Sequence, residues 1–157
     1  MHISEAVSYI NSVTSNYNPT VGIILGTGLG GFVDNIDIAY SIPYSDIPNM
    51  PVSTVEGHAG RLIFGTIGAV KVVAMQGRFH YYEGYTMKQV TFPVRVLAKL
   101  GIDYLFVVNE VDPAETYGFV SPLLIGAVVY DCGNASNDLV VAICKEIIGF
   151  AEFKGRI

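Results

Sequence analysis

The sequence predicts an α/β fold in one domain. Residues 21–25 and 104–108 are short apolar runs without polar alternation, which is typical of strands that are buried on both faces of a sheet. Residues 3–13 instead carry apolar side chains at helical spacing. A chain of 157 residues is long enough to bury a core of its own. We therefore expect residues 1–157 to form a single α/β domain.

Turns and prolines interrupt the first part of the expected sheet. The first helix should end at Asn18-Pro19, because proline cannot continue a helix. The strand at residues 21–25 runs directly into a glycine-rich loop at residues 26–31. Residues 42–52 contain several prolines, so this stretch can be neither a central strand nor a long helix.

A hairpin and a second helix follow. Residues 61–64 and 71–75 predict the two strands of a hairpin, with its turn between Gly65 and Gly68. Residues 86–100 have apolar side chains at helical spacing, which predicts a helix despite an interior proline, ended by the glycine that follows.

The end of the chain predicts two more elements beyond the strand at residues 104–108. Residues 124–130 form an apolar run that predicts another strand. Residues 136–138 offer N-cap side chains, so we expect a last helix from there to residue 149.

Composition excludes several classes of protein. Half of the residues are apolar (51%) and only 15% are charged, as in a globular protein. The net charge is −5 without a basic run, which argues against a nucleic-acid partner. Cys132 and Cys144 lack metal-site or CxxC spacing, which is typical of a cytoplasmic protein with reduced thiols. The first residues predict no signal peptide, and the apolar runs are too short to span a membrane.

The glycine loop allows three interpretations. Residues 26–31 fit G-x-G-x-x-G, and Asp46 lies about twenty residues past the start of the loop, as in a dinucleotide site. That motif needs a helix and then a strand, whereas residues 32–46 are acidic, short and followed by prolines. A phosphate nest, in which backbone amides and the Thr27 hydroxyl hold an anion, fits better. A tight turn without a ligand remains the simplest interpretation of the loop alone.

The richest cluster of polar and aromatic residues is at residues 75–85. Arg78 and His80 lie two apart on an expected extended segment, so their side chains should point to the same side. The Arg78 guanidinium suits phosphate, and His80 can donate hydrogen bonds. Glu83 could orient His80, and Tyr82 could pack against a sugar face. A surface hairpin with a charged rim is the structural alternative.

Two further segments carry polar groups at positions where ligands bind. His58 lies between glycines in residues 53–61, where a histidine in a turn and a ligand contact are both plausible. Asn109 and Glu110 end the strand that begins at residue 104, and the ends of such strands often bind ligands in α/β sheets. The Glu110 carboxylate would, however, repel a phosphate bound beside it.

Four segments together resemble one family. Residues 26–30 (GTGLG), 53–60 (STVEGHAG), 77–85 (GRFHYYEGY) and 90–95 (VTFPVR) are similar, in order and spacing, to the trimeric purine nucleoside phosphorylases. The resemblance extends over about residues 1–109. It implies a three-layer nucleoside phosphorylase fold around a mixed β-sheet. It also implies phosphorolysis of purine nucleosides to free base and pentose 1-phosphate, without a metal or an organic cofactor.

The resemblance assigns roles to individual residues. Thr27, His58 and Arg78 match the family's phosphate contacts. His80 matches a histidine near the ribose 5′-hydroxyl and the phosphate, and Tyr82 matches a tyrosine against the ribose.

Other expectations complete this site and its setting. His80 and Glu83 are the expected catalytic pair, and Asn109 matches a substrate-binding asparagine at the end of a strand. Inorganic phosphate is the expected co-substrate. A cytoplasmic homotrimer, in which a neighbouring subunit lends an aromatic residue to each site, is the expected assembly.

Residues 110–157 do not align with the family, so the fold is expected to be truncated or rearranged there. After Asn109 the sequence continues as Glu-Val-Asp-Pro, where the family has small residues, and the family's purine-binding groups lie in its second half. The alternative function is therefore a catalytically inactive α/β fragment or chimera that binds phosphate or a sugar phosphate. A third possible function, that of a dinucleotide-binding oxidoreductase, is supported by the glycine loop alone.

Overall fold

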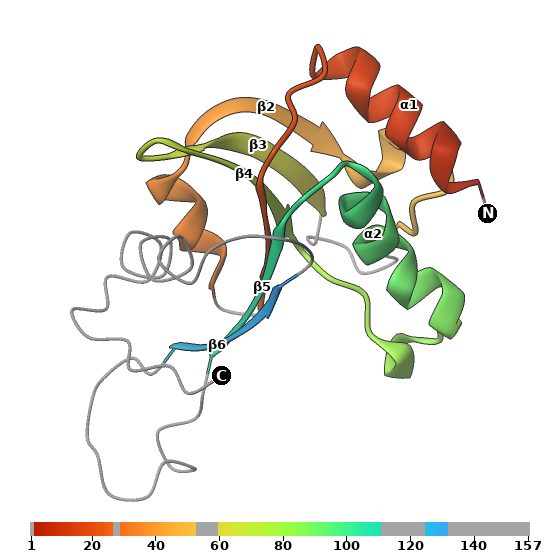
Figure 1. Cartoon of the computed structure of the whole chain (residues 1–157). Coiled ribbons are helices and arrows are strands. Elements are labelled where there is room, and N and C mark those ends of the chain that lie inside the picture. The colour runs from red at the N-terminus through yellow and green to blue at the C-terminus, as the bar shows by residue number, and fades with distance from the viewer. Residues whose placement is uncertain (1, 27–28, 53–59, 111–124, 132–157) are drawn as a thin grey trace, which may run out of the picture.

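A computed structural model describes residues 2–26, 29–52, 60–110 and 125–131, and its centre is a six-stranded sheet (Figure 1). The strands are β1 (Val21–Leu25), β2 (Asp37–Pro43), β3 (Arg61–Ile67), β4 (Val70–Gln76), β5 (Tyr104–Glu110) and β6 (Ile125–Asp131). Their order across the sheet is β2-β3-β4-β1-β5-β6. The strands predicted near residues 21, 104 and 124 are thus confirmed.

The sheet is mixed, as predicted. The three central strands are parallel, since β1 pairs in parallel with both β4 and β5. The pairs β2–β3, β3–β4 and β5–β6 are antiparallel. The strand β1, at the centre of the sheet, contains no polar side chain because both of its faces are covered. On β1, for example, Ile23 belongs to the core on one face and Ile24 to the core on the other.

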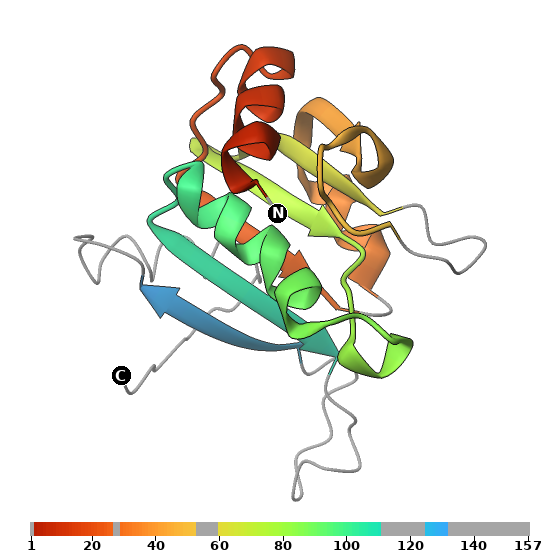
Figure 2. The ribbon, with the colours of Figure 1, turned by 90° about the vertical axis from the view of Figure 1, so that its right-hand side faces the viewer.

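Helices cover both faces of this sheet. The helices α1 (Ile3–Val13) and α2 (Met87–Lys99) lie together over one face, which Figure 2 turns toward the viewer. The 3-10 helix η1 (Leu29–Asn35) lies over the opposite face (Figure 1). The core between the sheet and the α-helices includes Ile10 and Leu97, and the core on the η1 side includes Val33. This arrangement confirms the α/β fold around a mixed sheet.

The helix α2 begins with a capping box. The Gln89 backbone N–H donates to the Thr86 hydroxyl over 3.3 Å, and the Thr86 backbone N–H donates to the Gln89 side-chain oxygen over 2.9 Å. Pro93 is accommodated inside the helix, as the sequence predicts, and the structure shows that it is buried. Gly101 follows the helix at φ +88°, a conformation that favours glycine.

The hairpin is confirmed, and its turn includes Gly68 as predicted, but Gly65 was wrongly placed in the turn. Gly65 lies inside β3, opposite Val72, and the chain turns instead at Gly68, where φ is +56°. Gly65 is needed in the strand because a Cβ there would lie 2.3 Å from the backbone oxygen of Asp37 on β2. A close approach of two backbones, and not a turn, explains this glycine.

The edge strand β2 was not predicted, and it excludes a dinucleotide-binding unit. After β1 the chain forms η1 and then β2, which pairs antiparallel with β3 and is not a neighbour of β1. A dinucleotide fold needs a helix and a parallel strand at this point. The segment at residues 42–52 contains the end of β2 and the short 3-10 helix η2 (Tyr44–Asp46), so it is neither a central strand nor a long helix, as predicted.

Some predictions lie outside the described residues or concern properties of the whole chain. The predicted last helix at residues 136–149 falls outside the described part. Among the residues that the structure describes, no helix is long and apolar enough to cross a membrane.

Candidate functional site

The predicted site segments meet at one edge of the sheet. Because β4, β1 and β5 are parallel, their carboxyl ends lie at the same edge. Gly26 follows β1, Gly77 follows β4, and Asn109 lies at the end of β5. The strand β3 runs in the opposite direction and begins at this edge, with Arg61 paired to Gln76. Segments that are distant in the sequence thus come together at this carboxyl edge.

Arg78 and His80 form a contact at this edge. The Arg78 Nε donates to His80 Nε2 over 3.3 Å, and both side chains are half-buried. This contact confirms the prediction that the two side chains point to the same side. An imidazole that accepts at Nε2 carries its own proton on Nδ1, so that second nitrogen is a donor. The pair therefore combines a fixed cation with an oriented N–H group.

Tyr82 stacks on the His80 ring. The ring centroids are 4.8 Å apart and the planes are inclined by 16°. Tyr82 lies in the 3-10 helix η3 (Tyr81–Glu83) and is 81% exposed. A shallow hollow of about 340 Å³ adjoins it, lined by Tyr81, Tyr82, Gly84, Tyr85 and Thr86. An exposed aromatic surface beside an imidazole can pack against the apolar face of a sugar ring.

Glu83 lies beside this group but is exposed, and the structure gives its side chain no hydrogen bond to His80. Its backbone N–H donates to the His80 carbonyl oxygen over 3.1 Å, which closes the turn of η3. The His80 ring is instead held by Arg78 and Tyr82. A catalytic role for Glu83 stays a prediction.

Phe79 attaches the segment at residues 77–85 to the core. It lies between Arg78 and His80 but points into the core, where it contacts Tyr44 and Tyr85 with ring centroids 5.4 Å away in each case. Tyr85 also donates its hydroxyl to the Val52 carbonyl oxygen over 3.1 Å. Tyr85 belongs to the predicted cluster at residues 75–85, although no role was predicted for it, and Tyr44 was not predicted at all. The signal that could have found them is that a buried tyrosine needs a hydrogen-bond partner for its hydroxyl.

For three of the predicted site residues, the structure gives no side-chain position. Thr27 and His58 lie outside the described residues. Asn109 is described by its backbone alone, which pairs with Gly126 of β6. Their described neighbours Gly26 and Gly60 adjoin β1 and β3 at the carboxyl edge.

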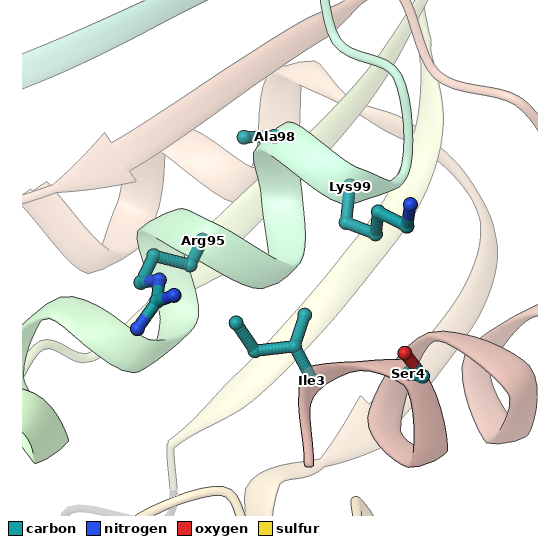
Figure 3. Close-up of a pocket in the computed structure, with 5 residues that line it drawn as sticks. All are labelled: Ile3, Ser4, Arg95, Ala98 and Lys99. Atoms are coloured by element: carbon teal, nitrogen blue, oxygen red, sulfur yellow. The ribbon is translucent and has the colours of Figure 1, made fainter. Parts of the chain in front are cut away.

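A second hollow, of about 490 Å³, lies between α1 and α2 and contains none of the predicted site residues. Figure 3 shows Arg95 and Lys99 extending from α2 and Ile3 and Ser4 on α1. Within the described ranges, no group of three or more His, Cys, Asp or Glu residues could hold a metal ion.

A family model and several relatives match the part of the chain that builds this edge. The model described as "Phosphorylase superfamily" matches residues 20–111. Purine nucleoside phosphorylase 1 of Geobacillus stearothermophilus is 61% identical over 92 residues, which are 59% of this chain and 34% of that protein. Its counterpart in Bacillus subtilis is 52% identical over 108 residues, or 69% of this chain and 40% of that protein.

The solved structures that are similar to this chain are also those of purine nucleoside phosphorylases. A crystal structure of a purine nucleoside phosphorylase in complex with ribose 1-phosphate matches with a TM-score of 0.64 at 47% identity, over 69% of this chain and 39% of that one. The Schistosoma mansoni enzyme in complex with inosine matches with a TM-score of 0.63 at 40% identity, over 74% and 41%. The chain thus spans roughly two fifths or less of the length of these proteins.

Proposed function

The chain belongs to the phosphorylase superfamily, and from this membership we propose that the protein cleaves purine nucleosides with inorganic phosphate. The products would be the free base and a pentose 1-phosphate. One observation carries the proposal: at the carboxyl edge of the sheet, Arg78 contacts His80, and His80 contacts Tyr82. Relatives that have been solved with ribose 1-phosphate and with inosine support this substrate class.

Phosphate is the proposed nucleophile. One of its oxygens forms a bond to C1′ of the pentose while the bond between C1′ and the purine nitrogen breaks, and the base leaves with the electron pair and then takes up a proton. Positive charge develops on the sugar as this bond lengthens, so an aligned phosphate dianion stabilises the transition state. We assign Arg78, together with Thr27 and His58, to the binding of that phosphate, because a guanidinium matches phosphate oxygens well.

The remaining residues orient the pentose. The Nδ1–H of His80 is a donor suited to the ribose 5′-hydroxyl, since Nε2 already accepts from Arg78. Tyr82 offers its exposed ring to the sugar. Glu83 is the proposed catalytic partner of His80, and Asn109 is a proposed substrate contact at the end of β5. Fixing the phosphate and the sugar in this way lowers the entropic part of the barrier.

The proposal extends to the setting of the enzyme. Inorganic phosphate is the only co-substrate, and neither a metal nor an organic cofactor takes part. We further propose a cytoplasmic homotrimer without nucleic-acid or membrane partners, as the resemblance to the trimeric family implies.

A catalytically inactive module that binds phosphate or a sugar phosphate is the second candidate. It is favoured by the family match, which stops at residue 111 although the chain continues to residue 157. The Arg78–His80 pair alone would be enough for anion binding.

Release of hypoxanthine from inosine separates the two candidates. The full chain is incubated with inosine in the presence and absence of inorganic phosphate, and free hypoxanthine is measured. The phosphorylase releases hypoxanthine only with phosphate. A protein that releases none, while phosphate still raises its melting temperature, is the inactive module. Stabilisation by NAD or FMN, and none by phosphate, would contradict both candidates.

A further inference from the structure

Tyr44 is a buried aromatic residue that the proposed reaction does not use. It begins η2 directly after the edge strand β2, and it is only 3% exposed. Its hydroxyl donates to the Gly77 carbonyl oxygen over 2.7 Å. Gly77 directly precedes Arg78, so this bond holds the backbone at the start of the site segment. Burial raises the pKa of the Tyr44 hydroxyl well above its ordinary value, which keeps it a donor throughout the neutral range.

Tyr44 also contacts the segment that carries His58. Its backbone N–H donates to the Gly60 carbonyl oxygen over 3.0 Å. A Cβ placed on Gly60 would lie 2.3 Å from two carbons of the Tyr44 ring, so the ring fits at this place only because residue 60 is glycine. Gly60 and Gly77 are themselves close, since a Cβ on Gly77 would lie 3.2 Å from the Gly60 Cα.

The third contact of Tyr44 is with Phe79, which lies between Arg78 and His80 in the sequence. The Tyr44 ring lies against Phe79, with centroids 5.4 Å apart and planes inclined by 43°. Phe79 alternates with Arg78 and His80, so its inward side chain fixes the direction in which those two side chains point. Tyr44 therefore holds the segment at the residue before Arg78 and at the residue after it.

The Arg78–His80 contact is sensitive to such support. Gly77 has φ +97°, and glycine can adopt many other backbone conformations because it has no Cβ, so its hydrogen bond to Tyr44 helps to fix this one. The Arg78–His80 hydrogen bond is 3.3 Å long, so a displacement of a few tenths of an ångström in the backbone would break it.

We propose that Tyr44 is a positioning residue: through Gly77 and Phe79 it sets the geometry of the Arg78–His80 pair. The consequence for phosphate affinity rests on the proposed function, whereas the consequence for the pair itself does not. Tyr44 touches neither substrate in this assignment.

The Tyr44→Phe variant tests the positioning role without any ligand. It removes only the hydroxyl, and the His80 ring nitrogens are then observed by ¹⁵N NMR. The chain has three histidines, so the His80 signals are assigned by their loss in His80→Gln. We expect the Nε2 signal to lose its hydrogen-bonded, unprotonated character and to move toward that of an exchanging pair of tautomers. Tyr40→Phe is the matched control, because Tyr40 is a half-buried tyrosine on β2 that packs on Tyr17.

Phosphate titration then measures the consequence. By calorimetry, we expect Tyr44→Phe to bind inorganic phosphate about three- to tenfold more weakly than the wild type, the range for the loss of one hydrogen bond. Tyr40→Phe should bind it normally. Melting temperatures of both variants show that the fold is retained, and if Tyr44→Phe does not fold, Phe79→Leu probes the other contact with the same readouts.

The outcomes are distinct. An unchanged His80 spectrum in a folded Tyr44→Phe variant would overturn the positioning role. A wild-type protein that binds no phosphate, with a His80 spectrum that still changes in Tyr44→Phe, would contradict the proposed function and leave the positioning role supported.

Discussion

At the scale of single residues, Arg78 gives the sharpest test of the phosphate site. Its guanidinium lies at the carboxyl edge and contacts His80, so replacement by alanine removes a fixed cation and also the hydrogen bond that orients the imidazole. We expect Arg78→Ala to weaken phosphate binding by ~1.5–3 kcal/mol, the range for a hydrogen bond to a charged group. Calorimetric titration with inorganic phosphate measures this loss.

Arg95 provides the matched control for that substitution. It is an exposed arginine on α2 and lines the hollow between the two α-helices, away from the predicted site. Arg95→Ala removes the same charge, so it should leave phosphate affinity unchanged at physiological ionic strength. Equal affinities in Arg78→Ala and the wild type would remove Arg78 from the site.

Residue-level prediction worked where the interaction is local. The shared orientation of Arg78 and His80 follows from alternation along an extended segment, and the structure confirms it. The support from Tyr44 could not be found in this way, because its hydroxyl reaches a carbonyl 33 residues away. That contact depends on β2 packing beside β3, which the sequence pattern did not predict. The functional roles of all the predicted site residues stay predictions: Thr27, His58, Arg78, His80, Tyr82, Glu83 and Asn109.

At the scale of elements, burial decided which strands could be predicted. The strand β1 is buried at every position, and an unbroken apolar run signals this clearly. The strand β2 has one buried residue, Ile42, in its seven positions, and a proline at its end. It lacks both an apolar run and strict alternation, as expected of an edge strand with one exposed side.

Gly65 allows the pairing of β2 with β3 to be tested. A Cβ at this position would lie 2.3 Å from the Asp37 backbone oxygen and 2.6 Å from a methyl group of Ile36. The backbone oxygen cannot move away without breaking the sheet, so we expect Gly65→Ala to lower the free energy of unfolding by about 1–3 kcal/mol or more. Urea-induced unfolding, followed by circular dichroism, measures the change.

Gly31 offers the corresponding control, since no atom lies within 4 Å of a Cβ placed there. Gly31→Ala should change the free energy of unfolding by less than about 0.5 kcal/mol. If Gly65→Ala were equally harmless, the close approach of β2 and β3 at Asp37 would not exist in solution.

At the scale of the whole molecule, the sheet order explains how segments that are distant in the sequence reach one edge of the sheet. The chain places β1 between β4 and β5, so Gly26 at the end of β1 lies next to Gly77 at the end of β4, although about fifty residues separate them in the sequence. Periodicity predicts the strands but not which of them become neighbours. The family resemblance provided the expected mixed sheet, and the parallel pairs of β1 together with the antiparallel pairs β2–β3, β3–β4 and β5–β6 confirm it.

We also predict that the folded protein loses stability at alkaline pH. Burial raises the pKa of Tyr44 above the ordinary value of 10.0. The pKa of Tyr17 is raised too, first by burial and then by the nearby Asp37 and Tyr40. The folded protein thus keeps protons that the unfolded chain releases. Stability from these groups is therefore fully present below pH 10.0 and is lost as the pH rises above that value.

Tyr44→Phe should reduce this sensitivity, because phenylalanine has no proton to lose. For the wild type, Tyr44 alone can contribute a fall in the free energy of unfolding of at most about 1.4 kcal/mol per pH unit above pH ~10. Urea unfolding at several pH values between about 8 and 11 gives the slope for each protein. The Tyr40→Phe control keeps the Tyr44 hydroxyl, so its free energy of unfolding should fall with pH nearly as steeply as that of the wild type. A Tyr44→Phe slope as steep as that of the wild type would mean that the Tyr44 hydroxyl ionises as readily in the folded protein as in the unfolded chain, and its bond to Gly77 would then not be formed in solution.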